Sequence, residues 1–269
     1  MILARTAAEL QVALATSRQR GARIGLVPTM GALHDGHLSL VRAARGACDT
    51  VVVSLFVNPA QFGRGEDLAE YPRDEAGDRA TAEAAGVDIL FAPTAAEMYP
   101  EGFDTWVDPG KIGTYLEGAA RPGHFRGVAT VCTKLFALVG PQLAYFGRKD
   151  AQQVAVVKQV VRDLALPVEI VACPTQRDAD GLALSSRNIF LSAAERSTAL
   201  ALPRALEAGL LAHRSGRDAV RAAHEVLDAE PGLLVDYVAI ADLDGLTMAA
   251  AALVGSTRLI DNVRLVEEA

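Results

Sequence analysis

The sequence predicts an α/β protein, in which helices cover both faces of a parallel sheet and a smaller α+β region follows. Two observations carry this prediction. Short, nearly continuous apolar runs alternate with segments of helical periodicity, which is typical of parallel strands joined by crossover helices. Near residue 176 the alternation stops and a long loop follows. We therefore expect two domains, residues 1–175 and 176–269.

The apolar runs of the first domain are expected to be buried strands, because both faces of such a sheet are covered. The segments between them have the periodicity of helices that pack on a sheet. The expected strands are residues 24–27, 50–57, 88–92, 143–146 and 168–173, and the expected helices are residues 38–47, 74–85, 128–139 and 152–164.

The second domain begins with a long loop that ends at Asn188. Helical segments come next and strand-like runs come last, which favours an α+β arrangement. The expected helices are residues 193–212 and 218–227, and the expected strands are residues 235–241 and 258–263.

The composition excludes several classes of protein. A net charge of −7 and a pI near 5.3 oppose nonspecific nucleic-acid binding, which needs a basic face. No apolar run is long enough to span a bilayer, and the first residues lack the pattern of an export signal. The three cysteines are odd in number and far apart, which fits a reducing compartment. We therefore expect a cytoplasmic protein that binds neither membrane nor nucleic acid.

The most informative segment lies directly after the first expected strand. It reads Pro28-Thr29-Met30-Gly31-Ala32-Leu33-His34-Asp35-Gly36-His37 and leads into an expected helix. Glycines let a backbone approach an anion closely, and free N–H groups at a helix start point toward negative charge. His34 and His37 are three residues apart, so on the first helical turn they share a face. The segment therefore predicts a site for the phosphates of a nucleoside triphosphate.

Two other interpretations of the histidine pair stay open. A metal site is one, although no nearby Cys, Asp or Glu completes a familiar ligand set. A pair of ordinary surface histidines is the other. Against it, the chain has five histidines, and two of them fall in one glycine-containing turn.

Two further loops follow expected strands, where parallel sheets bind ligands. The first reads Asn58-Pro59-Ala60-Gln61-Phe62-Gly63, in which Asn-Pro favours a turn and the Gln61 carboxamide both donates and accepts. The second reads Gly147-Arg148-Lys149-Asp150 and leads into the helix that carries Gln153. Lys149 is suited to reach a phosphate and Asp150 to cap the helix, whereas a capped surface helix is the alternative.

Two loops contain basic residues outside expected helices. Arg121-Pro122-Gly123-His124-Phe125-Arg126-Gly127 suits an anion, but on its own a basic surface loop is the simpler interpretation. Ser185-Ser186-Arg187 follows the last parallel strand at the domain junction, where clefts favour ligands. Taken alone, Ser-Ser-Arg is common by chance.

Together these segments resemble the pantothenate synthetase (pantoate–β-alanine ligase) family over essentially the full length of the chain. The HxGH turn alone would indicate only the wider nucleotidyltransferase superfamily, but six motifs in the same order are specific. The residues that carry the resemblance are Pro28 to His37, Asn58-Pro59-Ala60-Gln61-Phe62, Tyr71-Pro72-Arg73, His124-Phe125-Arg126-Gly127-Val128, Phe146-Gly147 with Lys149-Asp150 and Gln152-Gln153, and Asp180-Gly181-Leu182-Ala183 with Ser185-Ser186-Arg187-Asn188.

The resemblance implies a Rossmann-like first domain, a smaller C-terminal domain that acts as a lid, and a homodimer. It implies that pantoate, β-alanine and ATP give pantothenate, AMP and pyrophosphate through an enzyme-bound pantoyl adenylate. Mg²⁺ would assist on the phosphates. The reaction belongs to pantothenate biosynthesis, on the coenzyme A pathway.

By the same resemblance the catalytic residues are His37, His34 and Lys149. Gln61 would bind pantoate and β-alanine, and Gln153 would bind pantoate. The metal ligands are not assignable, with Asp78 and Asp150 as candidates. The implied ATP-binding residues are Met30, Gly31, Ala32, Leu33, His34, Asp35, Gly36, His37, Gly147, Arg148, Lys149, Asp150, Gln176, Leu184, Ser185, Ser186 and Arg187.

The chain departs from the family pattern at four places. Arg148 stands where an acidic residue is commoner, and Ala151 where an aromatic residue is usual. Gln176-Arg177-Asp178 replaces Val-Arg-Glu, and Ala60 replaces a larger residue. These departures concern the adenine pocket and the rates rather than the type of reaction.

Two other functions stay open on the sequence alone. One is an adenylyltransferase of the same superfamily that releases a stable nucleotidylated product. The other is a nucleotide-sensing module that binds ATP without turnover. Gln61 and Gln153 favour the ligase, because carboxamides suit a small polar acid with hydroxyl groups.

Overall fold

The computed structural model describes residues 1–266 and divides into two compact units. The first unit contains Met1–Gly147 and Gln153–Cys173. The second contains Arg148–Gln152 and the described residues from Pro174 onward. The short segment that carries Lys149 thus groups with the C-terminal unit, whereas the sequence predicts a single division between residues 175 and 176.

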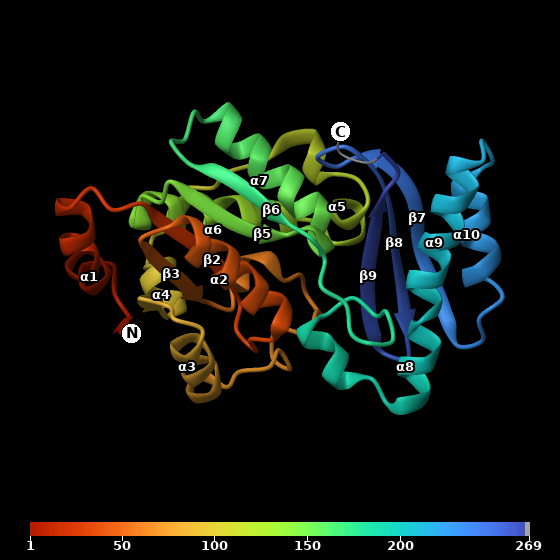
Figure 1. Cartoon of the computed structure of the whole chain (residues 1–269), viewed down its shortest axis with the longest axis horizontal. Helices are drawn as coiled ribbons and strands as arrows, with labels where there is room; N and C mark the ends of the chain where they lie inside the picture. Colours follow the sequence, from red (N-terminus) through yellow and green to blue (C-terminus); the bar gives the residue numbers. More distant parts are fainter. Residues whose placement is uncertain (267–269) are drawn as a thin grey trace. The chain divides into compact units, whose positions relative to one another are not determined.

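Within residues 1–266, the first unit is built on a six-stranded parallel sheet with the strand order β1-β4-β3-β2-β5-β6 (Figure 1). The chain runs from β2 through β3 and β4 on one side and through β5 and β6 on the other, so the order reverses between β2 and β5. Open α/β sheets bind ligands outside the carboxyl ends of their strands at such a reversal. The strands are β1 (Ile2–Ala4), β2 (Ile24–Thr29), β3 (Thr50–Leu55), β4 (Ile89–Phe91), β5 (Leu143–Gly147) and β6 (Glu169–Cys173).

Helices cover both faces of this sheet, as predicted. Helices α1, α6 and α7 pack with Leu26 and Val52 on one face, and α2 and α3 pack with Val27 and Val53 on the other. Neighbouring strand residues therefore alternate between two apolar layers. The helices are α1 (Ala7–Gln19), α2 (Asp35–Ala47), α3 (Glu75–Ala84), α4 (Ala95–Met98), α5 (Glu117–Ala120), α6 (His124–Val139) and α7 (Ala151–Asp163), with the 3₁₀ helices η1 (Pro59–Gln61) and η2 (Gly110–Gly113). The 3₁₀ helix η3 (Arg148–Asp150) lies between β5 and α7 in the chain and belongs to the second unit.

The sequence pattern does not predict β1 or α1. β1 is a short edge strand that pairs with β4, from Ile2↔Ile89 onward, and is too short for a periodic signal. α1 buries Leu10 and Leu14, but most of its remaining surface is exposed, so its apolar stripe is narrow.

In the described part of the second unit, β7, β8 and β9 form a three-stranded antiparallel sheet, on which α9 and α10 pack (Figure 1). The sequence predicts β7 and β9 but not β8, because the alanine run of β8 has high helix propensity. In the folded chain these alanines are buried. Helix α9 packs closely on β8 at Gly209, where a Cβ would lie 2.2 Å from Met248 Cε. The elements are η4 (Ser186–Phe190), α8 (Ala193–Ala199), α9 (Ala201–Arg214), α10 (Ala219–Leu227), β7 (Leu233–Asp242), β8 (Leu246–Val254) and β9 (Thr257–Arg264).

The single helix predicted over residues 193–212 is two helices, α8 and α9. Pro203 explains the interruption. It has no N–H for the carbonyl of Ala199, four residues earlier, and its ring crowds that carbonyl. The first helix accordingly ends at Ala199.

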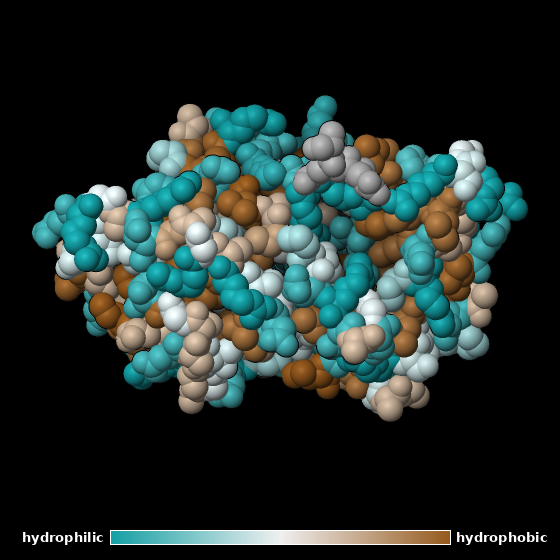
Figure 2. All heavy atoms as spheres, in the orientation of Figure 1, coloured by the Kyte–Doolittle hydropathy of each residue, from teal (hydrophilic) through white to brown (hydrophobic). Residues whose placement is uncertain are grey.

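Among residues 1–266, none of the helices has the length and apolar character needed to cross a bilayer. On the face drawn in Figure 2, hydrophilic residues predominate and apolar residues lie in separate patches.

Candidate active site

The turn between β2 and α2 has an unusual backbone. Gly31 and Ala32 adopt positive φ angles of 92° and 50°. Glycine takes such angles freely, whereas for alanine they carry a steric cost. The turn therefore needs support from outside its own sequence.

His34 and His37 cap α2, which begins at Asp35. His34 Nδ1 accepts a hydrogen bond from the Gly36 N–H at 3.2 Å, and His37 Nδ1 accepts one from the His34 N–H at 3.4 Å. The ring centroids are 4.1 Å apart, so the pair shares one face, as its spacing predicts. Because an accepting Nδ1 carries no proton, each neutral ring holds its proton on Nε2. Each ring is thus a donor through Nε2.

Asp78 of α3 supports this turn. Its carboxylate oxygens accept from the N–H of Ala32 at 2.9 Å and from the N–H of Leu33 at 2.7 Å, and the residue is 5% exposed. These two N–H groups therefore donate to Asp78 rather than to a ligand. Asp78 also fits poorly as a metal ligand, because both of its oxygens are used on the backbone.

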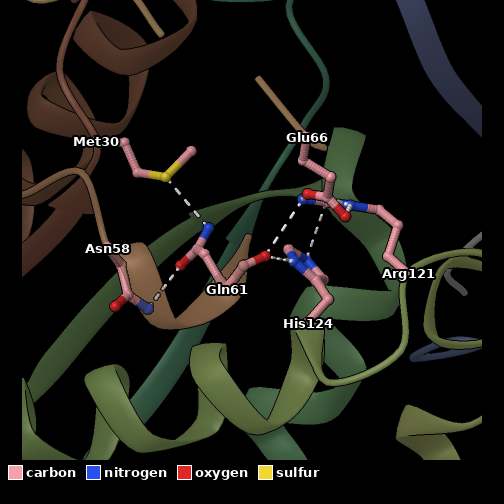
Figure 3. A network of polar contacts seen from close by, with 6 residues as sticks. All are labelled: Met30, Asn58, Gln61, Glu66, Arg121 and His124. Atoms are coloured by element: carbon pink, nitrogen blue, oxygen red, sulfur yellow. Dashed lines mark hydrogen bonds and ion pairs between the residues drawn. The ribbon is translucent and has the colours of Figure 1, made fainter. Parts of the chain in front are cut away.

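The Gln61 carboxamide is buried at the end of η1 (Figure 3). Its Oε1 accepts from Asn58 Nδ2 at 3.0 Å, and its Nε2 donates to the Met30 sulfur at 3.1 Å. Asn58 is fixed in turn, because it also donates to the Gly127 carbonyl and accepts from Tyr99 Oη. A thioether is a weak acceptor, so a ligand oxygen is able to replace it at Gln61 Nε2.

The loop from Arg121 to Gly127 is not the basic surface loop that its composition suggests. His124 is 8% exposed, and its Nδ1 lies 2.8 Å from the Gln61 carbonyl oxygen, to which it donates (Figure 3). Arg121 donates to the same carbonyl at 3.3 Å and forms an ion pair with Glu66. The loop therefore holds the backbone of Gln61.

Burial and charge decide the protonation states of this network. Burial, together with the adjacent Arg121 guanidinium, lowers the pKa of His124 to about 4. Burial opposes ionisation of Glu66, but its hydrogen bonds and charge interaction with Arg121 outweigh that effect and lower its pKa. At neutral pH His124 is therefore neutral and Glu66 is charged.

In the second unit, the turn that carries Lys149 is held by Asn262 of β9. The Asn262 Nδ2 donates to the carbonyls of Arg148 and Lys149, each at 2.8 Å. The Arg148 guanidinium pairs with Asp244 at 3.2 Å, which gives a local partner to the arginine that departs from the family pattern. Lys149 Nζ lies 3.7 Å from Asp150 Oδ1.

The loop from Gln176 to Arg187 also lies in the second unit. The Gln176 carbonyl accepts from the Leu184 N–H at 2.9 Å, and Ser185 Oγ accepts from the Arg187 N–H at 3.3 Å. Arg177 forms two hydrogen bonds with Asp261, at 2.6 and 3.0 Å. Ser185 and Arg187 are thus presented by an ordered turn.

The candidate residues fall into two groups. The first unit holds Met30–His37 and Gln61, with Gln153 half-buried in the first turn of α7. The second unit holds the Lys149 turn and the loop up to Arg187. Among residues 1–266, no group of three or more His, Cys, Asp or Glu side chains is arranged to hold a metal ion.

The sequence pattern does not identify the residues that hold these groups. It assigns Asn58 only to turn formation, Asp78 only to a possible metal site, and Asn262 to no role. Asp78 lies 46 residues from Ala32, and Asn262 lies 113 residues from Lys149. No local spacing signals such contacts.

Comparison with known proteins gives one consistent family. The model of the pantoate-beta-alanine ligase family matches residues 2–264. A pantothenate synthetase of Roseiflexus castenholzii is 56% identical over 253 residues, which cover 89% of this chain and 91% of that protein.

Solved structures agree. The pantothenate synthetase of Thermus thermophilus superposes with a TM-score of 0.93 at 48% identity, covering 99% of this chain and 100% of that one. A pantoate-beta-alanine ligase of Francisella tularensis, crystallised with beta-gamma ATP and beta-alanine, has a TM-score of 0.86 at 35% identity, with 98% of each chain covered.

Proposed function

The chain belongs to the pantoate–β-alanine ligase family and joins pantoate to β-alanine at the expense of ATP, and we propose which of its residues perform each step. Pantoate first reacts with ATP to give pantoyl adenylate and pyrophosphate. The β-alanine amine then attacks the activated acyl carbon and AMP leaves. The match over residues 2–264 disfavours the adenylyltransferase and nucleotide-sensor alternatives.

One contact carries the assignment of roles. Gln61 Nε2 lies 3.1 Å from the sulfur of Met30, so the carboxamide assigned to pantoate touches the turn assigned to ATP. Adenylation requires the pantoate carboxylate to meet the α-phosphorus, which needs the two sites to be adjacent. Gln61 and Gln153 bind pantoate in this proposal, and Gln61 also meets β-alanine.

The reacting groups define what the protein has to supply. A carboxylate is a poor acylating agent because its leaving group would be oxide, and attack on the α-phosphorus turns that oxygen into part of AMP. Negative charge grows on the phosphoryl oxygens and on pyrophosphate, so fixed donors and cations provide most of the stabilisation. His34 and His37 donate through Nε2, and Lys149 and Arg187 supply positive charge.

The remaining ATP contacts are assigned by the same logic. Met30–His37, Gly147–Asp150, Gln176 and Leu184–Arg187 contact ATP in this proposal. We assign no general base for the β-alanine amine among residues 1–266, so proximity is the main contribution of the protein to the second step.

Mg²⁺ is the metal expected with ATP, where it neutralises charge on the phosphate oxygens and on the leaving pyrophosphate. Mg²⁺ commonly takes few protein ligands and keeps phosphate oxygens and waters. Of the two candidate carboxylates, Asp150 fits better, because its side chain is 45% exposed whereas Asp78 binds backbone N–H groups. A homodimer, a lid role for the C-terminal unit and a cytoplasmic location complete the proposal.

The test is direct. The protein is incubated with ATP, Mg²⁺, pantoate and β-alanine, and pantothenate is sought by mass, with each substrate omitted in turn. We expect pantothenate, AMP and pyrophosphate in equal amounts only when all substrates are present. A stable nucleotidylated product with no amide would support an adenylyltransferase instead, and ATP binding without turnover would support a sensor.

A further inference from the structure

We propose that Asp78 is a positioning residue for adenylation: its carboxylate fixes the backbone of the ATP turn so that His34 and His37 face the phosphates. This inference rests on the proposed function, because it assumes that the turn binds ATP. The first observation is the pair of hydrogen bonds from the Ala32 and Leu33 N–H groups to the two oxygens of one carboxylate.

The shape of the turn makes such an anchor necessary. Ala32 has a φ of 50°, in the left-handed region that L-residues avoid. The residue is not glycine, so the conformation persists only where surrounding contacts favour it. Asp78 provides those contacts at Ala32 itself and at the next residue.

Gly31 permits the approach of the carboxylate. A Cβ at this position would lie 2.9 Å from Asp78 Oδ2 and 2.9 Å from Leu55 Cδ1. Gly31 also has a φ of 92°. The glycine is therefore required both by its backbone angle and by the space that Asp78 occupies.

The anchor also decides which groups of the turn meet the ligand. Because the Ala32 and Leu33 N–H groups are bound to Asp78, the groups of this turn that remain to bind an anion are the imidazoles of His34 and His37. The cap contacts of His34 and His37 start directly after Leu33, so a shift of the turn would move both rings. An error of about 1 Å in such a group lowers rates by as much as about a hundredfold.

The Asp78 carboxylate serves the ATP turn rather than the packing of its own helix. Asp78 is 5% exposed, and a buried charge is costly unless hydrogen bonds compensate it. On the same helix, Ala82 is fully buried and packs in the apolar core beneath the sheet. The polar atoms of Asp78 are used on the ATP turn, which distinguishes it from its packing neighbours.

The experiment compares the two half-reactions in Asp78→Asn and Asp78→Ala. ATP–pyrophosphate exchange in the presence of pantoate reports adenylation, and conversion of supplied pantoyl adenylate with β-alanine reports the second step. We expect exchange to fall about tenfold or more in Asp78→Asn and further in Asp78→Ala, with a raised KM for ATP. The second step should stay within about threefold, and the KM for β-alanine should not change, because neither depends on placing triphosphate.

Asp74→Ala is the matched control. Asp74 caps the same helix by accepting from the Gly77 N–H at 3.0 Å, so its carboxylate serves its own helix rather than the ATP turn. This variant should lower thermal stability while leaving adenylation within about twofold, since a helix cap affects stability rather than chemistry.

The outcomes separate the two hypotheses. If the unmodified protein forms no pantothenate, the proposed function fails. If it forms pantothenate but Asp78→Asn impairs both half-reactions equally, or neither, the positioning role is overturned while the function stands. A loss of adenylation in Asp74→Ala as large as in Asp78→Asn would also overturn it.

Discussion

The turn after β2 and the turn after β5 both follow strands at the reversal of the sheet, yet side chains of opposite hydrogen-bonding character hold their backbones. Asp78 accepts from two N–H groups of the first turn. Asn262 donates to two carbonyl groups of the second. The first anchor consumes donors that would bind phosphate, whereas the second satisfies acceptors that would repel it.

We infer from this difference that the two turns offer different groups to ATP. In the proposed mechanism the first turn contributes the ring N–H groups of His34 and His37, and the second contributes the side-chain ammonium of Lys149. Ring donors whose Nδ1 atoms are bound to the backbone of the helix start are well placed to orient the reacting phosphoryl group. A compact ammonium suits charge that develops on the leaving pyrophosphate.

The largest effect is expected from the charge of the second turn. Lys149→Ala should lower kcat by at least about a hundredfold, the scale of losing one preorganised donor at developing charge. Steady-state assays of pantothenate formation measure it. Lys149→Arg is the control, because it keeps the charge but not the compact shape, and it should recover part of the loss.

His37→Ala tests the first turn on the same scale, with a loss of about a hundredfold in kcat. If either alanine variant retains near-normal kcat, the corresponding turn does not act in catalysis, and the division of work between the turns is wrong.

The next effect is on the free energy of unfolding, which should depend on pH because His124, beside Gln61, is buried in its neutral form. The folded pKa of His124 is about 4, below its ordinary value of 6.5. Its stabilising contribution is therefore complete above about pH 6.5 and is lost as the pH falls toward 4, because the unfolded chain binds the proton more readily. Between pH 7 and pH 5 this amounts to about 2 kcal/mol.

Urea unfolding at pH 7 and pH 5 measures this difference. His124→Gln keeps a donor near the Gln61 carbonyl but does not titrate, so its free energy of unfolding should fall by about 2 kcal/mol less than that of the unmodified protein. Asn262→Leu in the second unit keeps His124, so its free energy of unfolding should change between pH 7 and pH 5 by the same amount as in the unmodified protein. Equal pH dependence in His124→Gln and the unmodified protein would mean that His124 titrates normally.

The fold follows from the sequence wherever the signal is local. The buried strands before the two turns read as apolar runs, and the turns read as glycine-containing segments followed by helix. β8 is different, because its alanines favour helix alone and become a strand only between β7 and β9. The break at Ala199 follows from Pro203, a local cause that periodicity conceals.

The candidate site divides in the same way. Residues that we propose to bind a ligand, such as His34, His37 and Gln61, lie in short motifs with recognisable chemistry. The residues that hold these side chains in place do not lie in such motifs. Asp78 and Asn262 contact the turns from distant positions in the chain, so only the folded structure identifies them.

A smaller effect is expected from the anchor of the second turn. Asn262→Leu keeps a side chain branched at Cγ but leaves the carbonyls of Arg148 and Lys149 without their donor. These hydrogen bonds are partly buried, so the loss of the donor should cost about 1 kcal/mol, and the displaced Lys149 should lower kcat by about tenfold. Enzyme assays well below the unfolding midpoint separate this loss from instability. Unchanged kcat in the folded variant would show that Asn262 does not position Lys149.

The smallest effect should come from breaking the ion pair between Arg148 of the same turn and Asp244. Asp244→Asn removes the charge partner of Arg148, at 3.2 Å, and asparagine tolerates the φ of 63° at this position. Both side chains of the pair are 22% exposed, so the ion pair should contribute less than about 1 kcal/mol, and kcat should change by less than about twofold. Urea unfolding and steady-state assays beside Asn262→Leu measure the contrast. A loss in Asp244→Asn as large as in Asn262→Leu would mean that the Arg148 ion pair, rather than the backbone carbonyls, holds the Lys149 turn.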